Sequence, residues 1–353
     1  MNQKTKTVKV VGSAFVNFQR GADSFFEFPL LNQLEKLKYN VVRRGTATFF
    51  VALNHNKHEY REFILNGGVS KNAFLIRLEP PSVFPAQYQK SIESLYAHVY
   101  TPGYAIDFEI GWPFKFQLNP AKPSSNELEQ VEWLDGSSIQ RVPDWLTRPI
   151  KVSMIASNKV SPLRDNHYRI RRQLARDIDP EILHVYGDLW NSDIYSKVLH
   201  RLKVAIFALR NNTLPNPIEI YGSLFSSYQT AYGPVRSKHE ILKNSQFSLV
   251  IENSRTTVSE KLFDVILNGA IPVYVGPKLS SVGIPSGVAF EWNLELDALH
   301  QFLENIDEHI IKNMMADGIS FIKSKTFLEK WTEDEVYKKL ATLINQRITE
   351  ALN

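Results

Sequence analysis

The chain has 353 residues, more than one hydrophobic core usually organises, so its length predicts two domains. Its 41 basic and 37 acidic side chains leave a net charge of +4, which does not by itself indicate a nucleic-acid partner and suits an anionic ligand. Cysteine is absent, which excludes disulfides, thiolate metal sites and cysteine nucleophiles.

The first third of the chain alternates predicted strands with predicted helices. Apolar runs predict strands at 8–18, 48–53 and 73–78, and helical spacing predicts helices at 29–37 and 59–66. This alternation is typical of an α/β domain with a parallel sheet. The polar run 54–58 contains His55 and His58. We expect a solvated loop there and no metal site, because no carboxylate stands at ligand spacing in the sequence.

A carboxylate follows the third predicted strand, in the run Leu78-Glu79-Pro80-Pro81. The proline at 80 favours an extended backbone for Glu79, so the turn presents this carboxylate at the sheet edge. A carboxylate placed in this way can act as a general base that takes a proton from an attacking hydroxyl. From the residues alone, an exposed strand-end carboxylate without a catalytic role is the better interpretation.

The segment 104–112 offers further polar and aromatic candidates. Asp107 and Glu109 lie on the same side of an extended segment, where they would contact an acceptor or, more typically, form the polar face of a surface strand. Trp112 belongs to an aromatic cluster that would stack on a sugar ring or, as most such clusters do, lie in the core. Residues 118–149 are rich in proline, serine and acidic residues, so we place a domain boundary near 149.

The second half begins with a predicted strand at 151–156, followed by Ser157-Asn158 and a basic helix over 169–178. We expect the arginines of this helix to form a solvated face. The run 247–251 predicts a buried strand, Thr257 an N-cap with Glu260 three residues later, and 271–275 a second strand. Strand, helix and strand together indicate two parallel strands joined by a right-handed crossover.

Four polar side chains would gather where the strand at 247–251 ends and the following helix begins: Glu252, Asn253, Glu260 and Lys261. Ligands bind at that edge of open α/β sheets. One interpretation is a nucleotide-sugar site, with Lys261 facing a diphosphate and Glu260 facing hydroxyls. The other is a capping box with a solvated lysine, and the spacing alone favours neither.

The segment 247–277 resembles the signature of the α1,3-fucosyltransferases of glycosyltransferase family 10. That signature reads approximately F-x-L-x-F-E-N-S, a short insert, Y-[VI]-T-E-K-[LI], and a small-residue turn before [VI]-P-[VI]-x-x-G. The matching positions are Phe247, Leu249, Glu252, Asn253, Ser254, Glu260, Lys261, Leu262, Gly269, Pro272, Val273 and Gly276. Thr257 replaces a tyrosine that lies against the donor in the family, and the insert is short.

The resemblance implies roles for residues outside the signature. Glu79 matches the element that carries the catalytic base, and Arg164 matches an arginine that grips the donor diphosphate. Ser157 and Asn158 match an S-N motif, and Lys238 corresponds to a lysine that approaches the donor or, as an alternative, is simply exposed. The resemblance also implies a GT-B fold, in which two Rossmann-like parallel-sheet domains face each other across a cleft.

This fold predicts three parts: an acceptor-side domain at 1–149, a nucleotide-sugar domain at 150–325, and a C-terminal helix at 326–353 that packs toward the first domain. We expect helices at 294–305, 309–322 and 332–352. The N-terminus lacks the apolar core of a signal peptide and no run has the length of a membrane span, so we expect a soluble, cytoplasmic protein. Peripheral contact with the inner face of a membrane or a lipid-linked acceptor is compatible with that location.

The function that the resemblance implies is transfer of fucose from GDP-fucose to a hydroxyl of an oligosaccharide or glycolipid, with inversion, an α linkage and no required metal or other cofactor. Such bacterial-type enzymes take part in lipopolysaccharide or other glycan biosynthesis. Two alternatives remain. A related transferase would use another sugar nucleotide, as Thr257 suggests, and a non-catalytic carbohydrate-binding relative would keep the site without the chemistry.

Overall fold

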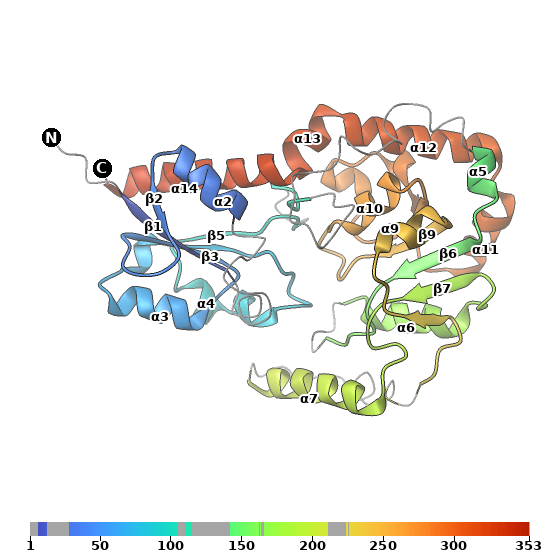
Figure 1. Ribbon diagram of the computed structural model, residues 1–353, viewed down its shortest axis with the longest axis horizontal. Helices are drawn as coiled ribbons and strands as arrows, with labels where there is room; N and C mark the ends of the chain where they lie inside the picture. Colours follow the sequence, from blue (N-terminus) through green and yellow to red (C-terminus); the bar gives the residue numbers. More distant parts are fainter. Residues whose placement is uncertain are drawn as a thin grey trace. The chain divides into compact units, whose positions relative to one another are not determined.

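The computed structural model describes residues 6–12, 28–104, 110–114, 142–161, 163, 166–210, 224 and 226–352 (Figure 1). The chain divides into two compact units, of which unit 1 holds Met1–Phe114 with Glu329–Asn353 and unit 2 holds Lys115–Leu328. The composition places a boundary near 149, whereas the structure divides the chain after Phe114. The proline- and serine-rich stretch between these points lies outside the described residues up to position 141.

Unit 1 contains a sheet of five parallel strands in the order β2-β1-β3-β4-β5. The strands are β1 (Thr7–Val11), β2 (Asn40–Val42), β3 (Phe49–Leu53), β4 (Ala73–Ile76) and β5 (His98–Tyr100). The helices are α2 (Phe28–Lys36), α3 (Lys57–Leu65), α4 (Lys90–Glu93) and α14 (Glu333–Leu352), with 3-10 turns at Ser70–Asn72 and Pro85–Tyr88.

The elements predicted in unit 1 are confirmed to within a few residues, except at two places. The first strand ends at Val11, and positions 13–18 of that prediction lie outside the described residues. The sequence does not predict β2, because this three-residue edge strand has no buried apolar run.

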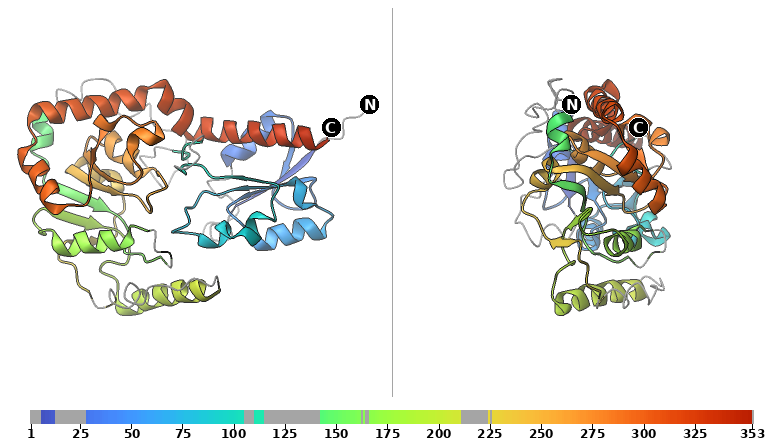
Figure 2. Two further views of the ribbon diagram at one scale, coloured as in Figure 1. Left: turned by 180° about the vertical axis from the view of Figure 1, so that it is seen from behind. Right: turned by 90° about the vertical axis from the view of Figure 1, so that its right-hand side faces the viewer.

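The central strands β3 and β4 of unit 1 are apolar throughout because helices cover both faces of the sheet. In β3, Phe49, Val51 and Leu53 belong to a cluster with α2 and α14, while Phe50 and Ala52 pack with α3. Successive side chains of a strand point to opposite faces, so one short run serves two cores. The last helix, α14, packs against α2, as Figures 1 and 2 show.

Unit 2 contains six parallel strands in the order β11-β10-β9-β6-β7-β8. The strands are β6 (Ile150–Ile155), β7 (Leu183–Tyr186), β8 (Ala231–Gly233), β9 (Ser245–Ile251), β10 (Ile271–Val275) and β11 (Phe290–Glu291). The helices are α5 (Val142–Leu146), α6 (Tyr168–Asp177), α7 (Ile194–Arg210), α9 (Lys238–Lys243), α10 (Lys261–Leu267), α11 (Leu296–Asn305) and α12 (Glu308–Lys323), and α13 (Lys325–Trp331) crosses the division between the units. Short 3-10 turns cover Leu279–Val282 and Ser286–Val288.

The strand order of unit 2 positions its loops. The chain starts in the middle with β6, adds β7 and β8 on one side, and then returns to place β9, β10 and β11 on the other. The predicted pair of parallel strands is confirmed, with Phe247 of β9 aligned with Ile271 of β10. The order reverses between β6 and β9, and the loops that follow these two strands diverge from that point.

Two predictions for unit 2 are wrong. Helix α10 begins at Lys261 with Glu260 as its N-cap, not at Thr257, because the amide and hydroxyl of Ser259 donate to the carboxylate of Glu252 instead of joining the helix. The arginines of α6 do not form one solvated face, since Arg171 and Arg172 are buried while Arg169 and Arg176 are exposed. The positions Tyr168, Arg171, Arg172 and Ala175 have helical spacing and form the inner stripe of α6.

Gly187 directly follows β7 and packs closely against the backbone that follows β6. Its φ is +139°, and a Cβ there would lie 2.5 Å from the carbonyl oxygen of Ala156, whereas Gly233 has a φ of +86° with open space around it. We expect Gly233→Ala to lower the free energy of unfolding by about 1–2 kcal/mol through backbone strain alone. Gly187→Ala should cost about 1–3 kcal/mol more, because the methyl group also overlaps a backbone atom. Urea unfolding followed by circular dichroism measures both, and equal losses would contradict the packing argument.

Candidate functional site

The candidate site lies in unit 2 at the carboxyl edge of the sheet, where the strand order reverses between β6 and β9. Three segments meet there: the loop after β6, the start of α6, and the loop 252–260 between β9 and α10. Backbone contact joins two of them, since the amide of His167 donates to the carbonyl of Asn253 over 3.1 Å. In an open α/β sheet this crevice is the expected place for a ligand.

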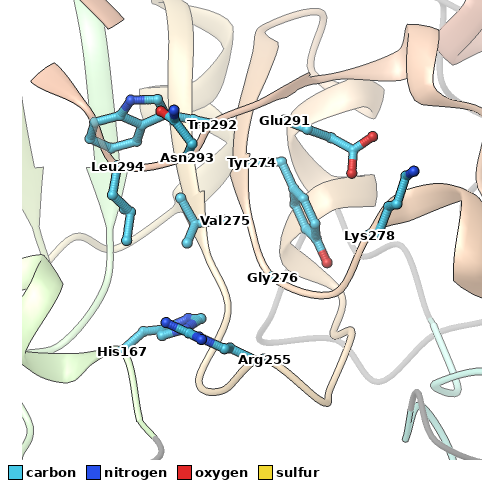
Figure 3. Close-up of a pocket in the computed structure, with 10 residues that line it drawn as sticks. All are labelled: His167, Arg255, Tyr274, Val275, Gly276, Lys278, Glu291, Trp292, Asn293 and Leu294. Atoms are coloured by element: carbon cyan, nitrogen blue, oxygen red, sulfur yellow. The ribbon is translucent and has the colours of Figure 1, made fainter. Parts of the chain in front are cut away.

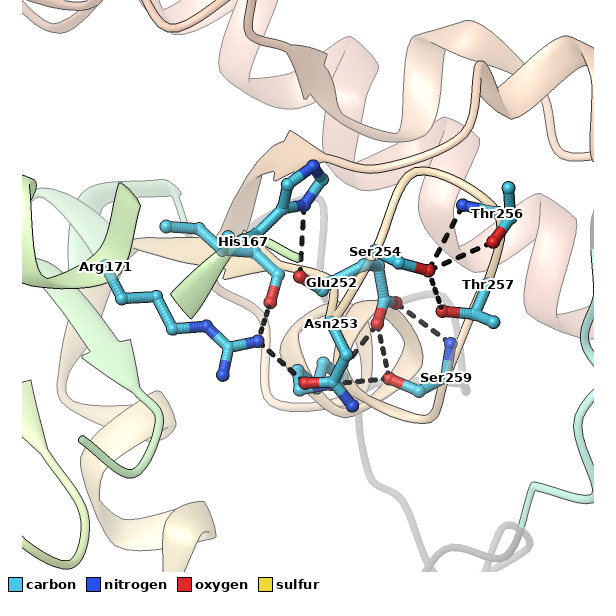
Figure 4. A network of polar contacts seen from close by, with 10 residues as sticks. His167, Arg171, Glu252, Asn253, Ser254, Thr256, Thr257 and Ser259 are labelled. Atoms are coloured by element: carbon cyan, nitrogen blue, oxygen red, sulfur yellow. Dashed lines mark hydrogen bonds and ion pairs between the residues drawn. The ribbon is translucent and has the colours of Figure 1, made fainter. Parts of the chain in front are cut away.

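Glu252 organises the loop 252–260 from the inside (Figure 4). Its side chain is fully buried, and its carboxylate accepts hydrogen bonds from the amide of Ser259 at 2.9 Å and the hydroxyl of Ser259 at 2.7 Å. The ammonium of Lys261 lies 3.2 Å from the same carboxylate and 2.8 Å from the Ser259 hydroxyl. A buried carboxylate needs such partners, so Glu252 positions Ser259 and Lys261 and is not itself open to a ligand.

Arg171 of α6 connects that helix to β9. Its guanidinium donates to the carbonyl of Ile251 over 2.6 Å and to the side-chain oxygen of Asn253 over 2.9 Å, and it lies over the ring of Tyr168. Burial lowers the pKa of Arg171, while Tyr168 and Glu252 oppose that shift. Asn253 is therefore oriented by an arginine that the sequence predicts to be exposed to solvent. Helical spacing from Tyr168 is the signal that would have placed Arg171 inside.

The hydroxyls of the loop form a second group. The Ser254 hydroxyl lies 3.1 Å from the hydroxyls of Thr256 and Thr257 and accepts from the amide of Thr256. Thr257 is half-buried and contributes to this turn rather than to a helix cap. The loop thus has an inner carboxylate and an outer turn of small hydroxyl side chains.

Glu260, Lys238 and Asp264 form a charged group at the start of α10. Burial would raise the pKa of Glu260, but Lys261 and Lys238 hold it below its ordinary value. Lys238 makes an ion pair with Asp264 at 2.5 Å. Burial raises the pKa of Asp264 despite this lysine, since Asp264 is only 4% exposed. Glu260 remains ionised and half-buried beside two cations, of which Lys261 is part-exposed at the crevice.

Ser157 and Asn158 lie in the loop after β6, and Asn158 is buried. The amide of Asn158 donates to the carbonyl of Asp188 over 2.8 Å, and its side-chain amide donates to Leu189 over 3.3 Å. The side-chain oxygen of Asn158 has no hydrogen-bond partner among the described residues. Asn158 therefore ties the loop after β6 to the loop after β7, and Ser157 beside it is half-buried.

A cavity of about 300 Å³ opens next to the loop 252–260 (Figure 3). It is lined by His167, Arg255, Tyr274, Val275, Gly276, Lys278, Glu291, Trp292, Asn293 and Leu294. The hydroxyl of Tyr274 is buried without a hydrogen-bond partner among the described residues, and a Cβ on Gly276 would lie 2.4 Å from it. The cavity combines two cations, a carboxylate, an amide and an aromatic wall, as sites for polar small molecules do.

Glu79 belongs to unit 1, in the turn that follows β4. The side-chain oxygen of Asn54 accepts from the amides of Leu78 at 2.8 Å and Glu79 at 3.2 Å, and Gln87 and Tyr88 donate to the Glu79 carbonyl. Asn54 adopts a left-handed φ of +61°, which directs its side chain into this turn. Glu79 is half-buried, and hydrogen bonds to both its amide and its carbonyl fix the backbone of this turn.

The run 54–58 is not the solvated loop that the sequence predicts. Asn54, His55 and Asn56 are buried, because Asn54 holds the Glu79 turn, His55 lies 2.8 Å from the Tyr96 hydroxyl and Asn56 caps α3. Carboxylates do stand near His58, since Glu59 and Glu62 come within 4.8 Å of it. The ammonium of Lys9 lies 2.9 Å from Glu59 and 3.1 Å from Glu62, so both carboxylates already neutralise a buried cation.

Other predicted site residues contribute less to this geometry. Arg164, Asp107 and Glu109 lie outside the described residues. Trp112 is half-buried and packs against the core cluster of unit 1, which is the commoner role of such an aromatic cluster.

The environment of His55 predicts a pH dependence of stability. Burial, with a smaller contribution from Lys57, lowers the pKa of His55 from 6.5 to about 4. The unfolded chain therefore binds this proton near pH 6.5 and the folded chain only near pH 4, so stability falls as the pH falls across that window. His55→Gln should remove about 2–3 kcal/mol of this loss in urea unfolding at each pH. His58→Gln, which alters a histidine that is 87% exposed, should leave the profile unchanged, and an unchanged His55→Gln profile would contradict the assignment.

No protein-family model matches this sequence, and none of the curated proteins matches it. The fold, by contrast, is similar to solved structures. A crystal structure of an α1,3-fucosyltransferase with GDP has a TM-score of 0.51 and 13% identity, over 99% of this chain and 92% of that chain. A crystal structure of an α1,3-fucosyltransferase has a TM-score of 0.50 and 15% identity, over 99% and 92%. With two all-parallel α/β sheets, this protein has a GT-B type fold.

Proposed function

We propose that this protein is an inverting glycosyltransferase that transfers fucose from GDP-fucose to a hydroxyl of an oligosaccharide or glycolipid acceptor, forming an α linkage. The observation that carries the proposal is the loop 252–260, in which buried Glu252 fixes Ser259 and Lys261 at the reversal point of a parallel sheet. The same residues carry the sequence resemblance to the α1,3-fucosyltransferases. Geometry and resemblance therefore favour the same site.

The donor would bind to unit 2. Lys261 has a part-exposed ammonium that can contact a diphosphate oxygen, and Arg164 is proposed to fork onto the same diphosphate. The ionised Glu260 can accept hydrogen bonds from ribose or sugar hydroxyls. Four further residues are proposed to support the site through the neighbours that they contact. Glu252 contacts Ser259, and Asn253 contacts Arg171. Asn158 contacts the loop after β7, and Lys238 contacts Asp264.

Glu79 is proposed as the general base. It would take the proton of the acceptor hydroxyl while that oxygen forms a bond to the anomeric carbon and the bond to the leaving nucleoside diphosphate breaks. Positive charge around the diphosphate stabilises the leaving group in this step. Asn54 and Gln87 hydrogen-bond to the backbone of Glu79, which fixes the position in unit 1 from which its side chain extends. Acceptor contacts are proposed for Asp107, Glu109 and Trp112.

Replacing the proposed base tests the mechanism. Glu79→Gln removes the proton acceptor with little change in shape, so turnover should fall by about 10²- to 10⁴-fold. Binding of GDP, measured by calorimetry, should stay the same, because the donor residues lie in unit 2. Glu35→Gln changes an exposed glutamate of α2 and should behave as the wild type. Near wild-type turnover of Glu79→Gln would remove Glu79 from this role.

The donor site is tested through Lys261. Lys261→Gln removes the charge but keeps a hydrogen-bond donor beside Glu252, so the affinity for GDP should fall about tenfold or more, since a hydrogen bond to a charged group contributes about 1.5–3 kcal/mol. Guanosine, which lacks the diphosphate, should bind both proteins equally. Lys312→Gln on the exposed face of α12 is the control. Equal losses for GDP and guanosine would mean that Lys261 does not face the diphosphate.

The main alternative is a transferase for another sugar nucleotide, which Thr257 favours because a small hydroxyl stands where the resembling family has a tyrosine. Thermal shift with GDP-fucose, GDP-mannose and UDP-sugars distinguishes a GDP-fucose enzyme from a transferase for another sugar nucleotide. A non-catalytic carbohydrate-binding relative would bind a donor yet neither transfer nor hydrolyse its sugar at high protein concentration. Mass spectrometry with galactose and N-acetylglucosamine acceptors detects the transfer.

A further inference from the structure

The cavity of unit 2 beside the loop after β9 has an apolar end and a polar end. Figure 3 shows Val275, Trp292 and Leu294 on one side of it, and these three residues are its apolar end. Lys278 and Glu291 lie on the other side and are its polar end. The described residues to which the donor is proposed to bind do not line this cavity, so that site does not account for it.

Leu294 is held at the apolar end by a strained backbone. Its φ is +73°, a left-handed conformation that glycine and asparagine adopt far more readily than leucine does. Its side chain packs against the core cluster of unit 2 and also lines the cavity. Strained residues persist where the surrounding structure fixes them, and they are concentrated at ligand sites. Leu294 therefore indicates a wall whose apolar character matters to a ligand.

The polar end suits hydroxyl groups rather than an anion. The ammonium of Lys278 can only donate hydrogen bonds, and the carboxylate of Glu291 can only accept them. Glu291 accepts from the amide of Leu279 over 2.9 Å, which holds the carboxylate in place while the residue stays exposed. This carboxylate would repel a phosphate beside it. A sugar hydroxyl, by contrast, can accept from the lysine and donate to the glutamate.

The separation of the two ends matches one class of sugar. A nucleobase has two flat faces that need apolar walls on both sides, but the apolar groups of this cavity gather at one end. A 6-deoxyhexose carries hydroxyls on one part of its ring and a methyl group on another. The volume of about 300 Å³ is at the small end of the range for ligand sites, so the cavity fits one ring and not a whole nucleotide sugar.

The cavity adjoins the proposed position of the diphosphate. Arg255, which lines the cavity, belongs to the loop 252–260. A Cβ on Gly276, another lining residue, would lie 3.0 Å from the Cγ of Glu252, whose carboxylate holds Lys261. A sugar bonded to a diphosphate at Lys261 is therefore next to the cavity.

We propose that this cavity receives the sugar ring of the donor and selects a 6-deoxyhexose, an inference that rests on the transferase function proposed above. The methyl group of the sugar contacts Val275 and Leu294, and its hydroxyls contact Lys278 and Glu291. A hexose with a hydroxymethyl group would bring a further hydroxyl against the apolar end, where it finds no hydrogen-bond partner. Leu294 is thus a residue that determines donor specificity.

Calorimetry of the full chain with GDP, GDP-fucose and GDP-L-galactose tests this assignment. L-Galactose carries a hydroxyl on the carbon that is the methyl group of L-fucose, so the two donors differ only there. The wild type should bind GDP-fucose on the order of tenfold more tightly than GDP-L-galactose. Leu294→Asn keeps the size of the side chain and suits the left-handed backbone. It should reduce this preference to about twofold or less, because the further hydroxyl then has a partner, and leave the affinity for GDP unchanged.

Two more variants test the walls separately. Val275→Thr, a change of similar shape, should also reduce the preference for GDP-fucose over GDP-L-galactose. Glu291→Gln keeps an acceptor for the amide of Leu279 but removes the charge, so GDP-fucose should bind about tenfold more weakly and GDP equally well. Leu146→Asn, which alters an exposed leucine of α5 away from the cavity lining, is the control and should keep all three affinities. Circular dichroism and the melting temperature check that each variant folds.

The outcomes separate this inference from the proposed function. An undiminished preference for GDP-fucose in both Leu294→Asn and Val275→Thr would overturn the assignment of the cavity and leave the transferase function intact. Equal losses of affinity for GDP and GDP-fucose in these variants would also overturn it, since the cavity would then hold the nucleoside or the diphosphate. A wild type that binds neither GDP nor GDP-fucose would refute the function itself, and this inference with it.

Discussion

The buried carboxylate of Glu252 is the constraint on which the candidate site depends. It has no exposed surface, so its two oxygens must be satisfied within the protein, and they take the amide and hydroxyl of Ser259 and the ammonium of Lys261. Meeting that requirement holds Ser259 in the loop, and α10 begins only at Lys261. The cost of burying a charge without partners thus fixes the shape of the loop that would face a donor.

Parallel topology explains why such a loop meets the right neighbours. Within each sheet all strands are parallel, so the loops that follow the strands gather at one edge of that sheet. In unit 2 the reversal between β6 and β9 brings the segment after β6, the start of α6 and the loop 252–260 together. In unit 1 the parallel strands likewise bring Asn54, which follows β3, next to the turn after β4 that contains Glu79.

Buried cations recur as connectors in this protein. Arg171 joins α6 to the carbonyl of Ile251 and to Asn253, and Lys9 in β1 is 1% exposed between Glu59 and Glu62 of α3. In each case the charge is compensated by oxygens from a different element, so the cation specifies how the two elements fit together.

The sequence by itself determined the class of fold, most strand and helix positions, and the place of Glu252, Glu260 and Lys261 at a strand end, because hydrophobic period and strand–helix alternation are local properties. Only the tertiary structure decided which charged groups are buried. The start of α10 depends on hydrogen bonds that Ser259 donates to Glu252, the burial of Arg171 depends on β9, and the burial of His55 depends on Tyr96, 41 positions away in the chain. The partners of Arg171 and His55 are distant in sequence, and the bonds to Glu252 are tertiary contacts within a loop, so propensity could not reveal any of them. A capping box and a solvated arginine face were the natural but incorrect local predictions.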